Sequence, residues 1–238
     1  MTLIRAIMEY NADGCLLYAE NFTGAYARGK DLAEAAAKFP DEIRRYRRWL
    51  GEAGADGEPC EVQVVEKKES RLQVCDADSD VLFHSERAPL SREEYTALRD
   101  LALRSAEDFQ RLYDSIADKT HTVLSPRKTF YGDVPLTAEA MYAHTQNVNG
   151  YYFGEIGVEA DNGPDIAACR RAGFAALEAA EGFLRNPVWD GSWGEQWTLR
   201  KLCRRFVWHD RIHARTMYRM ASRLCGAAKP ADPFCFSL

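Results

Sequence analysis

Residues 197–218 of this chain, WTLRKLCRRFVWHDRIHARTMY, contain neither proline nor glycine and predict one long helix. At about 100° per residue, one narrow stripe of this helix is apolar apart from two histidines, and the other side is strongly basic. His209 and His213 lie on the apolar stripe one turn apart, where two imidazoles can bind one ion together. The stripe consists of Leu202, Phe206, His209, His213, Met217 and Met220, and the basic side of Arg200, Lys201, Arg204, Arg205, Arg211, Arg215, Arg219 and Arg223.

Two histidines on a buried helix face need partners. Ring nitrogens that lose their hydrogen bonds to water without replacement cost a few kcal/mol of stability. A bound metal removes that cost, and so does a set of hydrogen-bonding neighbours. The spacing of the pair alone does not decide between a metal site and core histidines that their surroundings satisfy.

The composition is that of a soluble globular protein. The chain has 238 residues, 46% of them hydrophobic and 28% charged, which suits one large domain or two smaller ones. A net charge of −5 gives no general attraction to nucleic acid or to an anionic membrane. The apolar run from Leu3 to Met8 is interrupted by Arg5 and is too short for a signal peptide. The seven cysteines are scattered and form no C-x-x-C pair, which predicts reduced thiols and a cytoplasmic protein.

The N-terminal part of the chain has the pattern of a small α+β domain over residues 1–76. Apolar runs on either side of the turn residues Asn11 to Gly14 predict a hairpin, and Asp31 is a predicted helix cap. Strands followed by a helix and further strands are typical of an α+β module, and the polar residues 76–89 predict a linker after it. The predicted strands are 3–10, 15–19, 25–28, 61–66 and 71–75, and the predicted helix is 32–50.

This N-terminal module resembles the small HicB-like domain. The resemblance rests on the strand Gly14–Tyr18, on the bend Phe22-Thr23-Gly24, and on the helix that Asp31 opens and that ends in Tyr46-x-x-Trp49-Leu50. Such domains bind a toxin in toxin–antitoxin systems. Because no DNA-binding tail follows the module here, the resemblance implies a structural role or the docking of a protein partner.

Residues 90–226 predict four long amphipathic helices with no strand between them. Ser91 is an N-cap, with Glu94 completing a capping box, and Thr137 caps the second helix. Four such helices predict an all-α four-helix bundle, so the chain as a whole is predicted to be α+β. The predicted helices run from Ser91 through Ile116, from Thr137 to about Gly154, from Asp165 to Leu184, and along the basic stretch quoted first.

A third histidine lies on the second helix of the predicted bundle. Met141, His144 and Val148 share one stripe, so His144 is also predicted to face the core. Bundles build metal sites from side chains on facing helices, and three histidines with a fourth position open are the pattern of a catalytic zinc site. Asp210 follows His209 directly and points about 100° away from it, so it is not predicted as a ligand.

Residues 91–222 resemble the DinB-like (YfiT-like) family of metal-dependent enzymes. One matching segment is MYAHTQNVNGYY at 141–152, and the other is WTLRKL at 197–202 leading into WHDRIH at 208–213. The family's metal is held by one histidine of the second helix and by the H-x-x-x-H pair of the fourth. The resemblance therefore implies His144, His209 and His213 as ligands of a divalent metal, with zinc or nickel favoured and iron or manganese also suited.

The resemblance also implies an enzymatic activity on a small-molecule substrate. Characterised relatives are S-transferases and isomerases that use low-molecular-weight bacterial thiols, and others are described as hydrolases. A divalent ion on three neutral imidazoles lowers the pKa of a bound water or thiol, which makes either one a nucleophile at neutral pH. The rival hypothesis is a non-catalytic metal-binding or partner-docking protein, because no separate acid or base stands at a fixed spacing from the histidines.

The basic side of the long helix raises the question of nucleic-acid binding, since such runs can follow phosphates. Basic helix faces are more often solvated or paired with acidic neighbours, and nucleic-acid binding is not favoured here. No membrane partner is expected, and a homodimer is implied by the DinB-like resemblance. The acidic neighbours considered are Glu93, Glu94, Asp100, Glu107 and Asp108.

Overall fold

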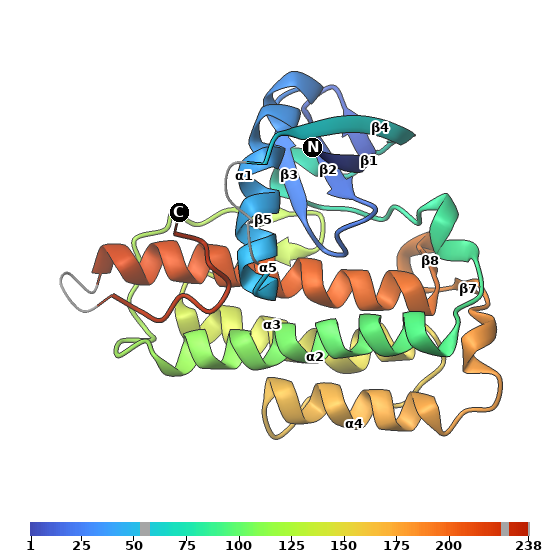
Figure 1. The fold of residues 1–238 in the computed structure, drawn as a ribbon. Helices are drawn as coiled ribbons and strands as arrows, with labels where there is room; N and C mark the ends of the chain where they lie inside the picture. The colour runs from blue at the N-terminus through green and yellow to red at the C-terminus, as the bar shows by residue number, and fades with distance from the viewer. Residues whose placement is uncertain (53–57, 225–228, 238) are drawn as a thin grey trace. The chain divides into compact units, whose positions relative to one another are not determined.

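The computed structural model describes residues 1–52, 58–224 and 229–237. The chain divides into two compact units, of which one carries the sheet and the other the long helices (Figure 1). This organisation confirms the predicted α+β fold class, with a small sheet-bearing part followed by a mostly helical part. The first unit comprises Met1–Phe83, Arg127–Val134 and Phe234–Leu238, and the second comprises His84–Pro126 and Pro135–Pro233.

The first unit is built on a four-stranded sheet. Its elements are β1 (Thr2–Asn11), β2 (Gly14–Ala19), β3 (Tyr26–Gly29), α1 (Leu32–Leu50) and β4 (Cys60–Glu69). β1 and β2 form the predicted antiparallel hairpin, and β2 also pairs antiparallel with β3. β4 pairs parallel with β1, so the strand order is β3-β2-β1-β4. The α1 helix supplies the crossover that a parallel pair requires.

The α1 helix packs on this sheet through one apolar face. The Asp31 side chain accepts a hydrogen bond from the backbone N–H of Glu34, and Gly51 ends the helix in the left-handed region at a φ of 77°. The ring of Trp49 lies 5.3 Å from that of Phe234, so the C-terminal segment contributes to the same core. The apolar residues buried on this face are Ala35, Phe39, Ile43, Tyr46 and Trp49.

The strand predicted at residues 71–75 is wrong. Val74–Asp76 is instead a short 3₁₀ helix, η1. The Asn11 side-chain amide donates to the backbone carbonyl of Leu72, and the Ser70 hydroxyl accepts from the N–H of the same residue. These side chains satisfy the backbone groups that a sheet ladder would otherwise use, which favours a turn over a strand.

The segment predicted as a polar linker, residues 76–89, is partly buried. Val81 and Phe83 are almost fully buried, and the ring of Phe83 lies 5.5 Å from that of Tyr18. The carboxylate of Asp78 accepts a hydrogen bond of 2.8 Å from the backbone N–H of Phe130. Phe130 connects two very short strands, β5 (Lys128–Thr129) and β6 (Gly132–Asp133).

The second unit contains the four predicted helices. They are α2 (Arg92–Asp114), α3 (Ala138–Gly154), α4 (Ile166–Glu178) and α5 (Leu199–Leu224). Both α4 and α5 contact α2 and α3 (Figure 1). α4 ends before the predicted Leu184, and Gly182 follows it in the left-handed region at a φ of 72°. Short elements complete the unit: η2 (His84–Arg87), η3 (Phe183–Arg185), β7 (Trp189–Asp190), η4 (Ser192–Gly194) and β8 (Gln196–Trp197).

The helix starts follow the predicted capping chemistry. Ser91 and Glu94 form a complete capping box, each side chain accepting from the other residue's backbone N–H. The Thr137 hydroxyl accepts from the N–H of Ala140 at the start of α3. These caps fix where α2 and α3 begin, and therefore which residues of each helix reach the neighbouring helices.

The basic side of α5 is buried in the first part of the helix, whereas Arg219 and Arg223 near its end are exposed. Every residue from Lys201 to Arg211 is buried, so this part of the helix is enclosed on all sides. The Arg204 guanidinium contacts both oxygens of the Glu86 carboxylate, at 2.5 and 3.0 Å. The Lys201 ammonium lies 2.8 Å from Glu195. These two buried cations are therefore paired with acids from outside the helix.

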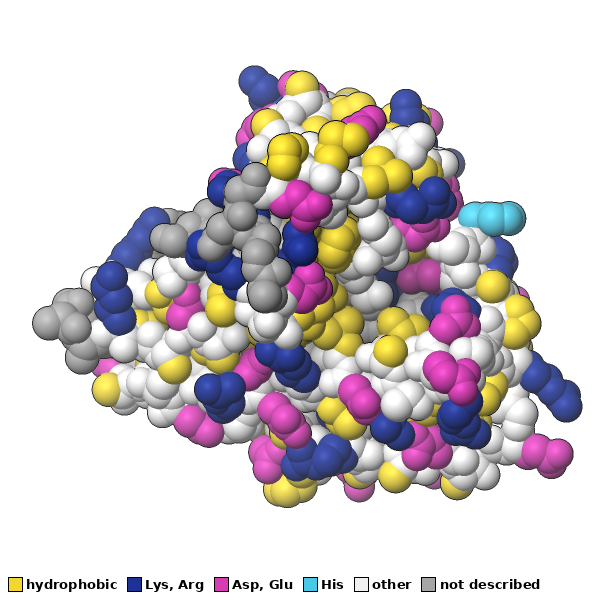
Figure 2. All heavy atoms as spheres, viewed as in Figure 1, with side chains coloured by type: hydrophobic (Ala, Val, Ile, Leu, Met, Phe, Trp, Pro, Cys, Tyr) yellow, Lys and Arg dark blue, Asp and Glu magenta, His cyan; other side chains and the backbone are white. Residues whose placement is uncertain are grey.

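One of the pairs expected from the sequence is present nearer solvent. Arg200 contacts Glu94 at 2.9 Å. Over the helical unit, the face drawn in Figure 2 shows acidic and basic side chains interspersed, with no extended field of one sign. In the parts of the chain that the structure describes, no helix has the length and apolar character that crossing a membrane requires.

A glycine in α4 gives a test of the helix packing. A Cβ added at Gly173 would lie 2.1 Å from Cε2 of Phe153, a ring that is fully buried on α3. Gly173→Ala is therefore expected to destabilise the protein by about 1–3 kcal/mol, although alanine is the better helix former. Chemical denaturation measures the free energy of unfolding.

The matched control is Gly154→Ala at the end of α3, where an added Cβ meets no atom within 4 Å. This variant is expected to be unchanged or more stable by up to about 1 kcal/mol. Equal stability of Gly173→Ala and the parent chain would contradict the close approach of α3 and α4.

Candidate metal centre

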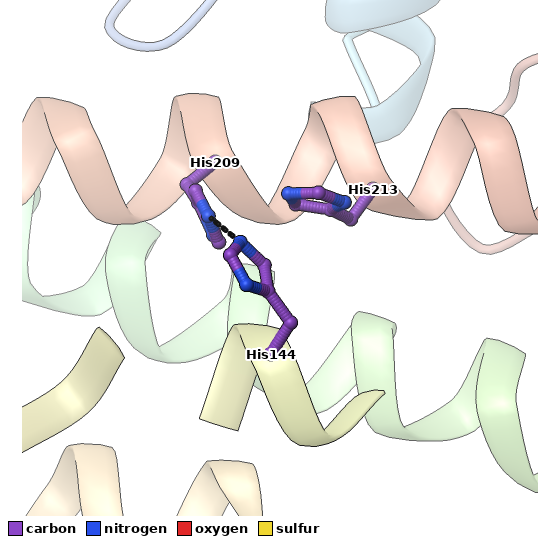
Figure 3. A group of neighbouring side chains, drawn as sticks. All are labelled: His144, His209 and His213. Atoms are coloured by element: carbon purple, nitrogen blue, oxygen red, sulfur yellow. Dashed lines mark hydrogen bonds between the residues drawn. The ribbon is translucent and has the colours of Figure 1, made fainter. Parts of the chain in front are cut away.

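Three histidine side chains converge between α3 and α5. His144 comes from α3, and His209 and His213 lie one turn apart on α5. Figure 3 shows the His144 ring reaching from α3 toward the two rings of α5. The ring centroids of His144 lie 5.0 Å from His209 and 4.7 Å from His213, and those of the α5 pair lie 4.5 Å apart. The three residues that the sequence indicated are thus side by side.

The ring nitrogens are spaced for a single ion. One nitrogen from each ring can be chosen so that all three lie within 4.8 Å of one another. The Nε2 atoms of His144 and His209 are 3.1 Å apart. Two nitrogens bound tetrahedrally to zinc at about 2.0–2.1 Å lie about 3.3 Å from each other. The Nε2 atoms of His144 and His209 are close to this spacing, and the set fits a cation that takes imidazole ligands.

The cluster contains no fourth ligand among the described residues. No carboxylate or thiol joins the three imidazoles in this group. His209 is 7% exposed and His213 is half-buried, but His144 is exposed. Three protein ligands with solvent access on one side are the arrangement of an open metal site rather than a closed structural one.

The exposure of His144 corrects its predicted position within the core. The buried stripe of α3 runs one residue away from the predicted one, so His144 lies at its edge. Thr145 and Asn149 in this stripe are polar, so a search for apolar residues at helical spacing does not find it. Asn149 is accommodated in the core because its side chain donates to the backbone carbonyls of Asp161 and Cys169. The residues buried in α3 are Ala138, Met141, Thr145, Asn149, Tyr152 and Phe153.

The surroundings keep two of the imidazoles neutral. Desolvation lowers the pKa of His144, even though the residue as a whole is exposed. Desolvation also lowers the pKa of His209 well below its ordinary value, and the neighbouring His213 and His144 add to the shift. A neutral imidazole is the form that binds a metal, because protonation occupies the lone pair that the metal needs.

The hydrogen bonding of His209 is incomplete within the described structure. Its Nε2 faces Nε2 of His144, and its buried Nδ1 has no hydrogen-bond partner there. Two facing Nε2 atoms form a hydrogen bond only if one of them carries a proton. If a cation takes the place of that proton, both nitrogens can bind the cation through their lone pairs. The donor set and the facing nitrogens therefore suit a divalent metal.

Aromatic rings support the buried side of the cluster. The Tyr152 ring packs edge-on against His209 with centroids 6.0 Å apart, and lies 5.2 Å from Phe206. Tyr152 is 2% exposed, in line with its position in the buried stripe. These rings exclude water behind His209, which accounts for the strong desolvation of that imidazole.

Asp210 points away from the histidines, as the helical spacing predicts. Its carboxylate pairs with the guanidinium of Arg170 on α4. The sequence analysis did not identify Arg170 as a residue of interest. A signal was present, because Arg170 lies one turn from Ile166 and Phe174 on the buried face of α4, where an arginine needs an acidic partner.

Comparison of the chain with protein-family models, with curated proteins and with solved structures gave no match. The DinB-like and HicB-like resemblances therefore stay predictions, and the geometry of the cluster carries the functional argument.

The lowered pKa values predict how metal binding depends on pH. Because the pKa of His144 and His209 lies below about 6.5, protons compete with the metal at these rings only in acid. The metal affinity, measured by titration from pH 8 to pH 5, is expected to fall most steeply below about pH 6.5. A steepest loss above that pH would show that these rings titrate like exposed histidines.

Proposed function

We propose that this protein is a metal-dependent enzyme of the DinB-like type. His144, His209 and His213 hold its divalent metal, with zinc or nickel favoured and iron or manganese also compatible with imidazole ligands. The observation that carries the proposal is the convergence of three imidazoles from two helices, with two Nε2 atoms 3.1 Å apart. Three imidazole nitrogen donors with no carboxylate in the group match the preferences of these ions.

The proposed reaction is the activation of a water or a low-molecular-weight thiol for hydrolysis or S-transfer. A divalent metal held by these three residues would lower the pKa of a bound water or thiol and so supply the nucleophile at neutral pH. The protein's own contribution is to present neutral imidazoles and to keep water away from the inner side through Tyr152 and Phe206. The exposed His144 leaves the other side accessible to a small-molecule substrate.

The accessible side of the cluster favours catalysis over a purely structural metal. A structural metal site is closed by a fourth protein ligand. Among the described residues, this group has three candidate ligands. Under the alternative of a non-catalytic protein, the bundle would keep its metal while the N-terminal module binds a partner. Turnover that depends on the metal separates the two hypotheses.

The proposed ligand set predicts the metal content of the protein. Protein purified without an affinity tag is expected to contain close to one divalent ion per chain by elemental analysis. His209→Ala is expected to lose it, because two imidazoles hold a divalent ion far more weakly than three. His121→Ala is the matched control, since His121 is exposed and hydrogen-bonds Asp118 at 2.5 Å rather than joining the cluster. Equal metal in His209→Ala and the parent chain would rule out the ligand set.

The proposed chemistry predicts metal-dependent turnover. Conjugation of an electrophile with bacillithiol, mycothiol or glutathione, or hydrolysis of an activated ester or amide, is expected to require added metal. His144→Ala is expected to abolish the activity while far-UV circular dichroism stays unchanged, because the exposed His144 contributes little to the core. An activity that survives metal removal and His144→Ala would show that the reaction takes place elsewhere in the protein.

A further inference from the structure

A buried ion pair links α4 to α5 beside the histidine cluster. Nη1 and Nη2 of Arg170 lie 3.2 and 3.3 Å from the two carboxylate oxygens of Asp210, in a two-point contact. Both side chains are fully buried. The Arg170 guanidinium also lies 3.6 Å from the centre of the Phe206 ring, and Nη1 is 3.4 Å from the backbone carbonyl of Ala102 on α2.

Burying this pair has a large desolvation cost compared with an apolar contact between the two helices. Removing both charges from water costs free energy that the attraction between them only partly returns, and apolar residues of similar volume often do as well or better. Nε of Arg170 is also buried without a hydrogen-bond partner in the described structure. Stability alone therefore does not explain the pair.

The ion pair fixes the rotation of α5 about its own axis relative to α4. Asp210 is the neighbour of His209 and projects about 100° around the helix from it. The two-point contact with Arg170 holds that carboxylate in one orientation, which an apolar contact would not specify. His209 and His213, which flank Asp210 in the helix, face His144.

Metal ligation is sensitive to such a rotation. A side chain tip lies about 6 Å from the helix axis, so a rotation of about 10° displaces it by roughly 1 Å. Bonds between a metal and its ligands tolerate only about 0.2 Å. Phe206 reinforces the constraint, because Arg170 stacks on its ring while Tyr152, which packs against His209, contacts the same ring.

We propose that Arg170 and Asp210 are positioning residues for the metal centre: their two-point contact sets the rotation of α5 at which His209 and His213 meet His144. The inference rests on the proposed metal site. It gives α4, which carries no ligand of the cluster, a specific part in building the centre.

The test compares metal binding with folding in the full-length chain. Arg170→Met combined with Asp210→Leu replaces the buried pair by apolar side chains, which is expected to preserve the fold. Cobalt(II) serves as the probe, because its visible absorption reports the geometry of its ligands. The double variant is expected to bind cobalt about 10- to 100-fold more weakly, as for other changes beside a metal site, and with an altered absorption spectrum.

The matched control is Arg171→Met combined with Glu107→Leu, which removes a neighbouring but exposed pair of the bundle with a separation of 3.0 Å. It is expected to keep the parent affinity and spectrum. Arg170→Lys keeps the charge but loses the two-point contact, so it is expected to show a smaller loss of affinity and remains informative if the double variant does not fold.

Parent-like affinity and spectrum in folded Arg170→Met/Asp210→Leu, or in Arg170→Lys, would overturn the inference while leaving the metal site intact. A role in stability alone would lower the thermal midpoint without changing the cobalt spectrum, and would equally overturn it. Failure of the parent chain to bind cobalt at all would overturn the metal site, and the inference with it.

Discussion

Three imidazoles from two helices share one small space, and this arrangement depends on how α5 is held within its bundle. His209 is buried behind Tyr152 and Phe206, and desolvation keeps it neutral. His144 reaches the same space from the exposed edge of α3. The cluster therefore combines a buried inner side with an accessible outer side, which is the combination that an open metal site requires.

The remainder of α5 shows how a strongly basic helix can be the most buried element of its unit. Its buried cations are paired with acids from other segments: Glu86 for Arg204, and Glu195 for both Lys201 and Arg205. Burial lowers the pKa of Lys201 to about 8, although the neighbouring carboxylate opposes the shift. Charges enclosed in this way specify position rather than add much stability, because their desolvation offsets most of their attraction.

Much of this architecture follows from local sequence patterns. The hairpin of β1 and β2, the capping box at Ser91 and the four helices all rest on residues close together in the chain, and the structure contains them. The spacing of His209 and His213 likewise places both rings on one side of α5 by helical geometry alone.

The differences arise where residues distant in the chain decide the outcome. Arg204 and Glu86 are separated by 118 positions, so periodicity within α5 cannot reveal that the first part of its basic side is enclosed. The exposure of His144 follows from a core stripe that contains Asn149, whose side-chain NH₂ donates to a loop carbonyl and to a carbonyl of α4. The pairing of Arg170 with Asp210 joins two helices whose relative rotation no single-helix pattern specifies.

The central claim is that one divalent ion binds at the point where the three imidazoles meet. Anomalous diffraction at the absorption edge of the metal, from crystals grown without chelator, tests it most directly. We expect a single strong peak at about 2.0–2.2 Å from one nitrogen each of His144, His209 and His213. A peak bound to other residues, or three rings turned apart with no peak between them, would contradict it.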